Sequence, residues 1–266
     1  MIRKDLNKLI RLLKSFFYYI IFIGDSMKKV QVKKDDYIIY GPDSLKRIIN
    51  DTIGILDKKV IEYKKLFDSD FRPFVVNYFD DINKFHNFLR SLGDNDFPDY
   101  CQGTFDEGMV NGYIDSNLIV DSPKYKDRLY TPSHELFHIM YLELVLKGDS
   151  SKRSVWYDEG MAQFYSGEKD YLDNPEEFKN YFDKVRKITK TIPDLNKVSH
   201  ENGFVTDDYN GYDLSYLAVR YLSETLSEEE FKRLLFNPQL IEGYGKDIVN
   251  KMFSYYDELL NKEKTR

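Results

Sequence analysis

The chain has 266 residues, of which 42% are hydrophobic and 16% aromatic, enough to bury a full core in one large domain or two small ones. Its 39 lysines and arginines are outnumbered by 45 aspartates and glutamates, a net charge of -6, so no overall positive field favours nucleic acid and we expect no nucleic-acid partner. The single cysteine, Cys101, excludes a disulfide bond within the chain.

The N-terminal segment, residues 1–27, joins a basic cluster to an apolar run. Basic side chains gather before residue 15, and the sequence FFYYIIFI follows at 16–23, too short a run to span a bilayer. Three interpretations remain open. The first is a secretory signal, although no small-residue cleavage site follows. The second is an interfacial helix whose basic face contacts a membrane. The third is a helix packed on the domain, or upstream sequence that is not translated if Met27 is the true start. A cytoplasmic location is favoured over a secreted or membrane-associated one.

The remainder, residues 28–266, shows no internal repeat or linker and is expected to form a single domain. Runs rich in β-branched and aromatic residues predict strands, and apolar residues at helical spacing predict helices. In chain order the predicted elements are a strand at 36–41, a helix within 43–67, a strand at 72–79, a helix at 82–92 and a strand or tight hairpin at 112–121.

From Thr131 onward the pattern becomes mostly helical. Thr131 is a good N-cap, Pro132 suits a first helical position, and Gly148 supplies a stop. Further along, a capping box begins at Ser227, and a last helix is predicted near 245–260. Strands first and helices afterwards predict an α+β fold, with a mixed α/β part and a small sheet followed by a mainly helical part.

The predicted helix at 131 contains the sequence HELFH, which places His134 and His138 one turn apart on one face. That spacing lets two imidazoles bind one tetrahedral ion, and Glu135 can then reach a water on the metal. The competing interpretation is a pair of core histidines on a buried helix.

A third ligand is offered by Glu159 in the sequence WYDEGMAQFY at 156–165. Asp158 can cap a short helix that Gly167 ends, which puts Glu159 in the first turn. The alternative is an ordinary solvated acid, but the aromatic and small residues around it, with no basic neighbour, favour burial, and a buried carboxylate needs a partner. Two histidines and one glutamate with an open fourth position form a catalytic zinc shell, so we expect one zinc ion per chain.

HELFH followed by WYDEGMAQFY resembles the gluzincin metallopeptidases of the peptidase MA-like group, which includes aminopeptidase N. The resemblance implies a zincin-like fold, zinc ligation by His134, His138 and Glu159, and Glu135 as general base. The stretch 212–222 resembles a helix of these families that begins with a tyrosine facing the zinc, which implies that Tyr212 donates to the developing oxyanion.

The sequence departs from the gluzincin pattern at two places. The sequence GMVNG at 108–112 lacks the glutamate with which aminopeptidases of the group bind a free amine, so we expect an endopeptidase-like enzyme. Gln163 replaces the aspartate that in some relatives orients a ligand histidine, which leaves Asp158 or backbone carbonyls for that role.

The sequence therefore predicts a zinc-dependent peptidase whose peptide or protein substrate pairs with a strand edge within 110–120. The alternative is a non-catalytic protein that keeps the gluzincin fold for binding or regulation. Glu135 favours the enzyme, because a structural zinc site has no use for a general base. His86 and His200 have no ligand-type partner nearby in the sequence and are predicted to be surface or core residues.

Overall fold

The computed structural model describes residues 29–93, 97, 101–106, 108–120, 122–200 and 202–264. The N-terminal segment, with its three open interpretations, lies outside these residues. The sequence predicts one domain over 28–266; the structure divides the chain into two compact units, Met1–Ile139 and Met140–Arg266. None of the helices in the described part of the chain combines the length and apolarity that a membrane span requires.

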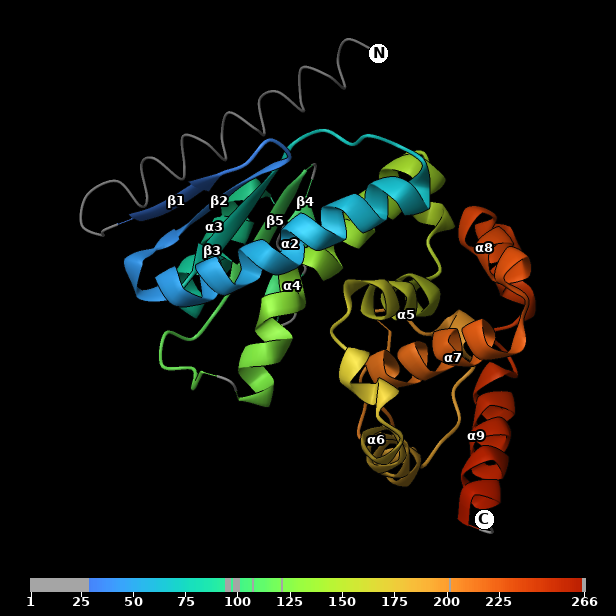
Figure 1. Ribbon diagram of the computed structural model, residues 1–266. Coiled ribbons are helices and arrows are strands. Elements are labelled where there is room, and N and C mark those ends of the chain that lie inside the picture. The colour runs from blue at the N-terminus through green and yellow to red at the C-terminus, as the bar shows by residue number, and fades with distance from the viewer. Residues whose placement is uncertain are drawn as a thin grey trace. The chain divides into compact units, whose positions relative to one another are not determined.

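The first unit contains a five-stranded sheet in the order β1-β2-β3-β5-β4 (Figure 1). The central pairs β2/β3 and β3/β5 are parallel, whereas the outer pairs β1/β2 and β5/β4 are antiparallel. Parallel neighbours require crossover connections, which here are helical. The strands are β1 (Lys29–Lys33), β2 (Tyr37–Pro42), β3 (Phe74–Phe79), β4 (Gly103–Asp106) and β5 (Met109–Tyr113).

Two crossover helices, α2 (Lys46–Phe67) and α3 (Ile82–Leu92), cover opposite faces of this sheet (Figure 1). Helix α2 contacts the face that carries Tyr78, whose hydroxyl lies 3.3 Å from the Thr52 hydroxyl. The next residue, Phe79, points to the other face, where its ring packs 5.7 Å from that of Phe85 in α3. Adjacent strand residues face opposite sides of a sheet, so each helix buries its own row of side chains.

The sequence predicts part of this unit correctly. The strands expected at 36–41 and 72–79 and the helices expected at 43–67 and 82–92 are confirmed. The strand or hairpin expected at 112–121 is wrong, because β5 ends at Tyr113 and a turn follows. Strands β1 and β4 were not expected: both are short and end the sheet, where one paired side gives a weak sequence pattern.

All the regular elements described in the second unit are helical, and isolated β-bridges occur only in the irregular stretch 199–210. The unit contains α5 (Val155–Ser166), α6 (Pro175–Ile188), α7 (Gly211–Thr225), α8 (Glu228–Phe236) and α9 (Ile248–Lys264), with short 3-10 turns between them. The predicted capping box is confirmed, since Ser227 and Glu230 exchange side chain to backbone hydrogen bonds at the start of α8.

Helices α5 and α7 cross closely in the second unit. A Cβ atom at Gly160 would overlap the backbone carbonyl oxygen of Ser215 in α7, so the close crossing requires glycine at this position. Elsewhere in the unit, aromatic rings join α6 to α9, with Phe182 lying 5.6 Å from Tyr256.

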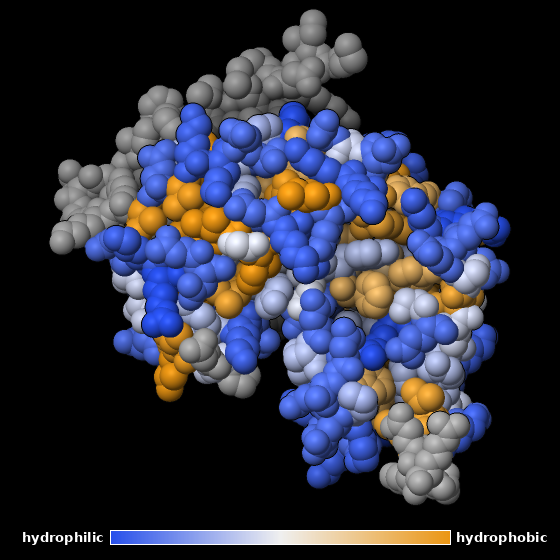
Figure 2. Space-filling model, viewed as in Figure 1, coloured by the Kyte–Doolittle hydropathy of each residue, from blue (hydrophilic) through white to orange (hydrophobic). Residues whose placement is uncertain are grey.

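The fold is therefore mixed α/β, with a small sheet in the first unit and helices in the second. The expected order of strands followed by helices is too simple, because strands and helices alternate within the first unit. Figure 2 shows hydrophobic side chains scattered among hydrophilic ones on the face in view, as is usual for a globular surface.

Candidate metal centre

Helix α4 (Pro123–Met140), which carries HELFH, begins nine residues before its expected first residue, Pro132. Ser122 Oγ accepts a hydrogen bond from the Tyr125 backbone N–H at 3.1 Å, and Pro123 takes the first helical position. The expectation that Thr131 caps the helix is wrong. Pro132 lies inside the helix, where it has no N–H group to donate, although its ring fixes a helical φ. The start signal expected from Thr131 and Pro132 is supplied instead by the upstream pair Ser122 and Pro123.

Contacts with α2 fix the orientation of α4. The Tyr63 hydroxyl donates to the Ser133 carbonyl oxygen at 3.1 Å, and the ring of Phe137 packs against those of Tyr63 and Phe67. A π-helical turn, Tyr141–Val145, follows α4. The helical path ends shortly before the predicted stop at Gly148: Leu146 is the C-cap, and the Gly148 N–H, at a φ of 75°, donates to the Leu142 carbonyl oxygen at 2.9 Å.

The two histidines of α4 meet at their Nε2 atoms, which lie 3.1 Å apart. His138 is buried, with 2% of its surface exposed, and its ring stacks on Phe105 of β4 with centroids 5.3 Å apart. Glu135 lies against the same strand: a Cβ atom at Gly103 would be 2.8 Å from Glu135 Oε1. The end strand β4 thus passes directly along the side chains that the sequence singled out.

Glu159 lies in the second turn of α5, one turn later than expected. Ser154 occupies the N-cap position, Asp158 is a buried residue of the first turn, and Gly167 ends the helix with a φ of 86°. The expectation that Asp158 caps the helix is therefore wrong, whereas the stop at Gly167 is confirmed. The burial expected for Glu159 is also confirmed, because only 4% of its surface is exposed.

Two basic side chains contact Glu159 Oε1, contrary to the expectation that it has no basic neighbour. Arg153 Nη2 lies 2.9 Å from this oxygen and His200 Nε2 lies 3.0 Å from it. Arg153 Nε also pairs with Asp158 Oδ2. His200, predicted to be a surface or core residue, is half-buried and hydrogen-bonded to Glu159. No sequence motif marks His200, because its approach to Glu159 depends on a turn 41 residues further along the chain.

Tyr141 and Tyr157 are buried phenols of the second unit, and Tyr141 is close enough to Asp158 for the charge of this carboxylate to act on it. Burial raises the pKa of Tyr141, and the negative charge of Asp158 raises it further. Burial also raises the pKa of Tyr157. Both phenols therefore stay neutral near pH 7.

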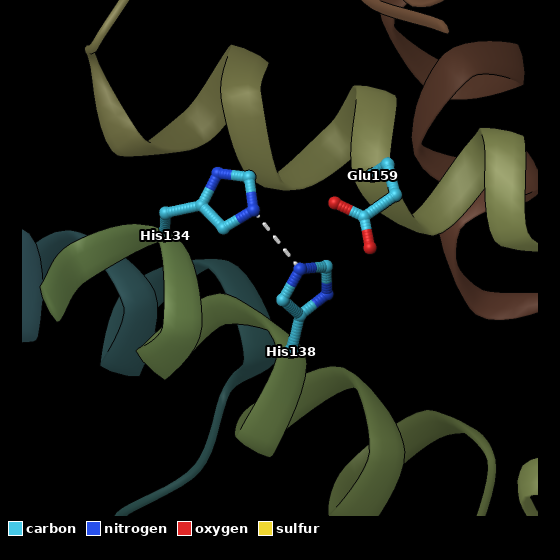
Figure 3. A group of neighbouring side chains, drawn as sticks. All are labelled: His134, His138 and Glu159. Carbon is cyan, nitrogen blue, oxygen red and sulfur yellow. Dashed lines mark hydrogen bonds between the residues drawn. The ribbon is translucent and has the colours of Figure 1, made fainter. Parts of the chain in front are cut away.

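The side chains of His134, His138 and Glu159 form a group whose ligand atoms all lie within 4.8 Å of one another (Figure 3). The group could hold a metal ion. Two imidazole nitrogens that bind one tetrahedral zinc ion at about 2.0–2.1 Å lie about 3.3 Å apart, and the 3.1 Å separation of the two Nε2 atoms is close to that value. The nitrogen and oxygen donors are of the kind that zinc binds, and the two histidine nitrogens are spaced as one such ion would hold them.

Tyr212 is the second residue of α7, and Asn210 caps that helix by accepting a hydrogen bond from the Tyr212 N–H. Its ring lies 5.9 Å from that of His200 and 4.8 Å from that of Phe204. Gln163 Nε2 donates to the Tyr212 carbonyl oxygen at 3.0 Å, so Gln163 ties α5 to α7. The predicted catalytic role of Tyr212 stays a prediction.

The other sequence candidates occupy structural positions. His86 Nε2 lies 3.2 Å from the Cys101 carbonyl oxygen and its ring packs beside Phe97, which confirms a packing role. The substrate edge expected within 110–120 is wrong for its strand portion, because β5 lies between β3 and β4. Among the described strands, β4 is the one that ends the sheet on this side.

No family model matches the chain, and no curated protein matches it either.

Proposed function

We propose that the chain is a zinc-dependent peptidase in which His134, His138 and Glu159 bind one zinc ion and Glu135 is the general base. The observation that carries the proposal is the gathering of the three ligand side chains together with a glutamate next to the first histidine in the sequence. A structural zinc site has four protein ligands, whereas a catalytic one has three and keeps a position open.

Each residue has a defined part in the proposed reaction. Zinc, when bound, supplies a Lewis acid for the scissile carbonyl and lowers the pKa of a water molecule toward about 7. Glu135 takes a proton from the attacking water and transfers it to the leaving nitrogen. The Tyr212 hydroxyl donates to the oxygen on which negative charge develops.

The end strand β4 is the proposed docking edge for the substrate. An extended peptide adds to a sheet by backbone hydrogen bonds, with alternate side chains entering pockets. Strand β4 passes Glu135 at Gly103 and His138 at Phe105, so a peptide paired with it would run beside the proposed general base. The substrate class is therefore an extended peptide or a protein loop.

Metal analysis and proteolysis test the proposal together. Purified wild-type protein should contain about one zinc ion per chain, and His138→Ala should contain almost none. Glu135→Gln should retain the zinc but lose about 10² to 10⁴ in the rate of peptide cleavage, because an amide cannot accept the proton. Equal zinc in wild type and His138→Ala, or full activity in Glu135→Gln, would contradict the proposal.

A diverse peptide library tests where the proposed enzyme cuts. Each peptide is supplied with a free and with an acetylated N-terminus, and the products are identified by mass spectrometry. An endopeptidase cuts both forms at internal bonds. Cleavage that requires the free amine would instead indicate an aminopeptidase. Zinc binding without any cleavage would favour the non-catalytic alternative.

A further inference from the structure

The carboxylate of Glu159 is held at one oxygen by two donors of the second unit. Arg153 Nη2 and His200 Nε2 both approach Oε1, at 2.9 Å and 3.0 Å. Glu159 is buried, and hydrogen bonds to a charged group in a buried setting are stronger than those between neutral groups. Two such bonds on one oxygen restrict the rotation of the carboxylate about its final bond.

Arg153 joins Glu159 to the preceding acid. Its Nε donates to Asp158 Oδ2 while its Nη2 donates to Glu159 Oε1, so one planar guanidinium spans two successive carboxylates. Two negative charges and one positive charge leave a net charge of about -1, which still attracts a cation. The guanidinium therefore orients Glu159 without cancelling the charge of the pair.

His200 completes the arrangement from a tight turn. Ser199 and Asn202 exchange backbone hydrogen bonds around it, and its ring packs 4.9 Å from Phe204 and 5.9 Å from Tyr212. A carboxylate only accepts hydrogen bonds, so Nε2 must carry the hydrogen in this contact. The aromatic neighbours fix the ring, and the ring in turn fixes Oε1.

We propose that Arg153 and His200 are positioning residues that hold Glu159 through Oε1, so that Glu159 binds the metal through its other oxygen alone. This inference rests on the proposed zinc site. A carboxylate that binds through one oxygen completes a three-ligand shell with an open position, whereas binding through both oxygens would raise the coordination number. Partners of this kind typically affect metal affinity by about 10- to 100-fold when removed.

Substitutions at His200 separate its hydrogen bond from its packing. His200→Phe keeps a ring against Phe204 and Tyr212 but removes the donor, whereas His200→Gln keeps an N–H at similar reach. We expect His200→Phe to raise the zinc dissociation constant by about 10- to 100-fold, measured by competition with a chromophoric chelator, and His200→Gln to stay close to wild type. His86→Phe, which changes a histidine that also packs beside a phenylalanine but lies outside the site, is the control.

Cobalt substitution gives a readout independent of activity. A four-coordinate cobalt(II) centre absorbs visible light strongly, and this absorption weakens when a second carboxylate oxygen binds. We expect cobalt-loaded wild type and His200→Gln to share one spectrum and His200→Phe to show the weaker absorption. Arg153→Lys, which keeps the charge but loses the planar fork, should also bind zinc more weakly. This variant tests the positioning role if His200→Phe fails to fold.

The outcomes distinguish this inference from the proposed function. If wild type binds no zinc, or His138→Ala binds it equally well, both are overturned. If wild type binds zinc but His200→Phe and Arg153→Lys match its affinity and its cobalt spectrum, the positioning role is overturned and the zinc site stands.

Discussion

Gly103 has no side chain, and this leaves room for β4 to pass close to the carboxylate of Glu135. An added Cβ would lie 2.8 Å from Glu135 Oε1 and 3.0 Å from Thr131 Cγ2, both closer than non-bonded atoms normally approach. Glycine at this position therefore sets the distance between the proposed docking edge and the proposed general base.

Gly103→Ala should lower kcat while leaving the zinc content unchanged. The new methyl group displaces the Glu135 carboxylate, and a misplacement of about 1 Å in a catalytic group can cost about 100-fold in rate. Gly112→Ala is a matched control, because Gly112 faces Gly103 across β4 and β5 and its added Cβ meets Tyr78 at an ordinary 3.5 Å. Equal kcat in both variants would contradict the argument.

Tyr212→Phe should lower kcat by about 10² to 10³ with unchanged zinc, the usual effect of losing one oxyanion donor. The interaction is stronger in the transition state than in the ground state, so KM should change less than kcat. Steady-state kinetics measures both constants, with zinc content and melting temperature determined alongside.

Two tyrosines near Tyr212 are controls with known hydroxyl contacts. Tyr209 donates to the Gly203 carbonyl oxygen at 2.7 Å, and the Tyr216 hydroxyl lies 3.4 Å from Arg220 Nη1. Their Phe variants should lose about 1 kcal/mol of stability at most and keep kcat. A purely structural Tyr212 would behave like them, with a lower melting temperature and a normal kcat.

Residues four apart on one helix are the part of the site that local sequence can predict. His134 and His138 follow from helical geometry alone, and the burial of Glu159 follows from its apolar setting. Arg153 and His200 could not be found in this way. Their contacts with Glu159 depend on a loop conformation before α5 and on a turn far along the chain, and neither conformation leaves a periodic pattern.

At the scale of elements, helix boundaries depend on which of several capping signals the chain uses. The sequence offers both Ser122-Pro123 and Thr131-Pro132 as starts for α4, and the structure uses the first. The two signals are chemically equivalent, so local sequence does not choose between them. The contact of Tyr63 with Ser133 shows that packing against α2 stabilises the part of the helix around the second signal.

Alanine at two helical glycines should change stability in opposite directions. Gly54 is exposed in α2 with open space around an added Cβ, so Gly54→Ala should stabilise by about 0.4–1 kcal/mol through its helix propensity. Gly160→Ala should destabilise by about 1–3 kcal/mol, because its methyl group overlaps α7.

Chemical denaturation of the two glycine variants measures both free energies of unfolding beside that of the wild type. The sign of the change in the free energy of unfolding of Gly160→Ala decides whether the helix crossing requires glycine. If this variant is as stable as Gly54→Ala, the close crossing of α5 and α7 does not depend on glycine.

At the scale of the whole molecule, the sequence predicts element types better than their pairing. The β-branched runs that form β2 and β3 are evident, but nothing in them specifies that β5 pairs with β3 while β4 ends the sheet. Pairing is a long-range property that a single sequence does not display as periodicity. For this reason the free edge expected within 110–120 falls partly on β5, a strand that is paired on both sides, although the expected grouping of His134, His138 and Glu159 is found.

Zinc should raise the thermal stability of wild-type protein and leave that of His138→Ala nearly unchanged. A ligand that binds only the native state stabilises it by RT ln(1 + [L]/Kd), about 2.7 kcal/mol at a hundredfold excess over Kd. For a chain of this size each kcal/mol corresponds to about 2–4 °C, so a shift of about 5–10 °C is expected. Melting curves of chelator-treated protein during a zinc titration measure it. An equal shift in His138→Ala would place the bound metal elsewhere, and no shift in wild type would contradict a native zinc site.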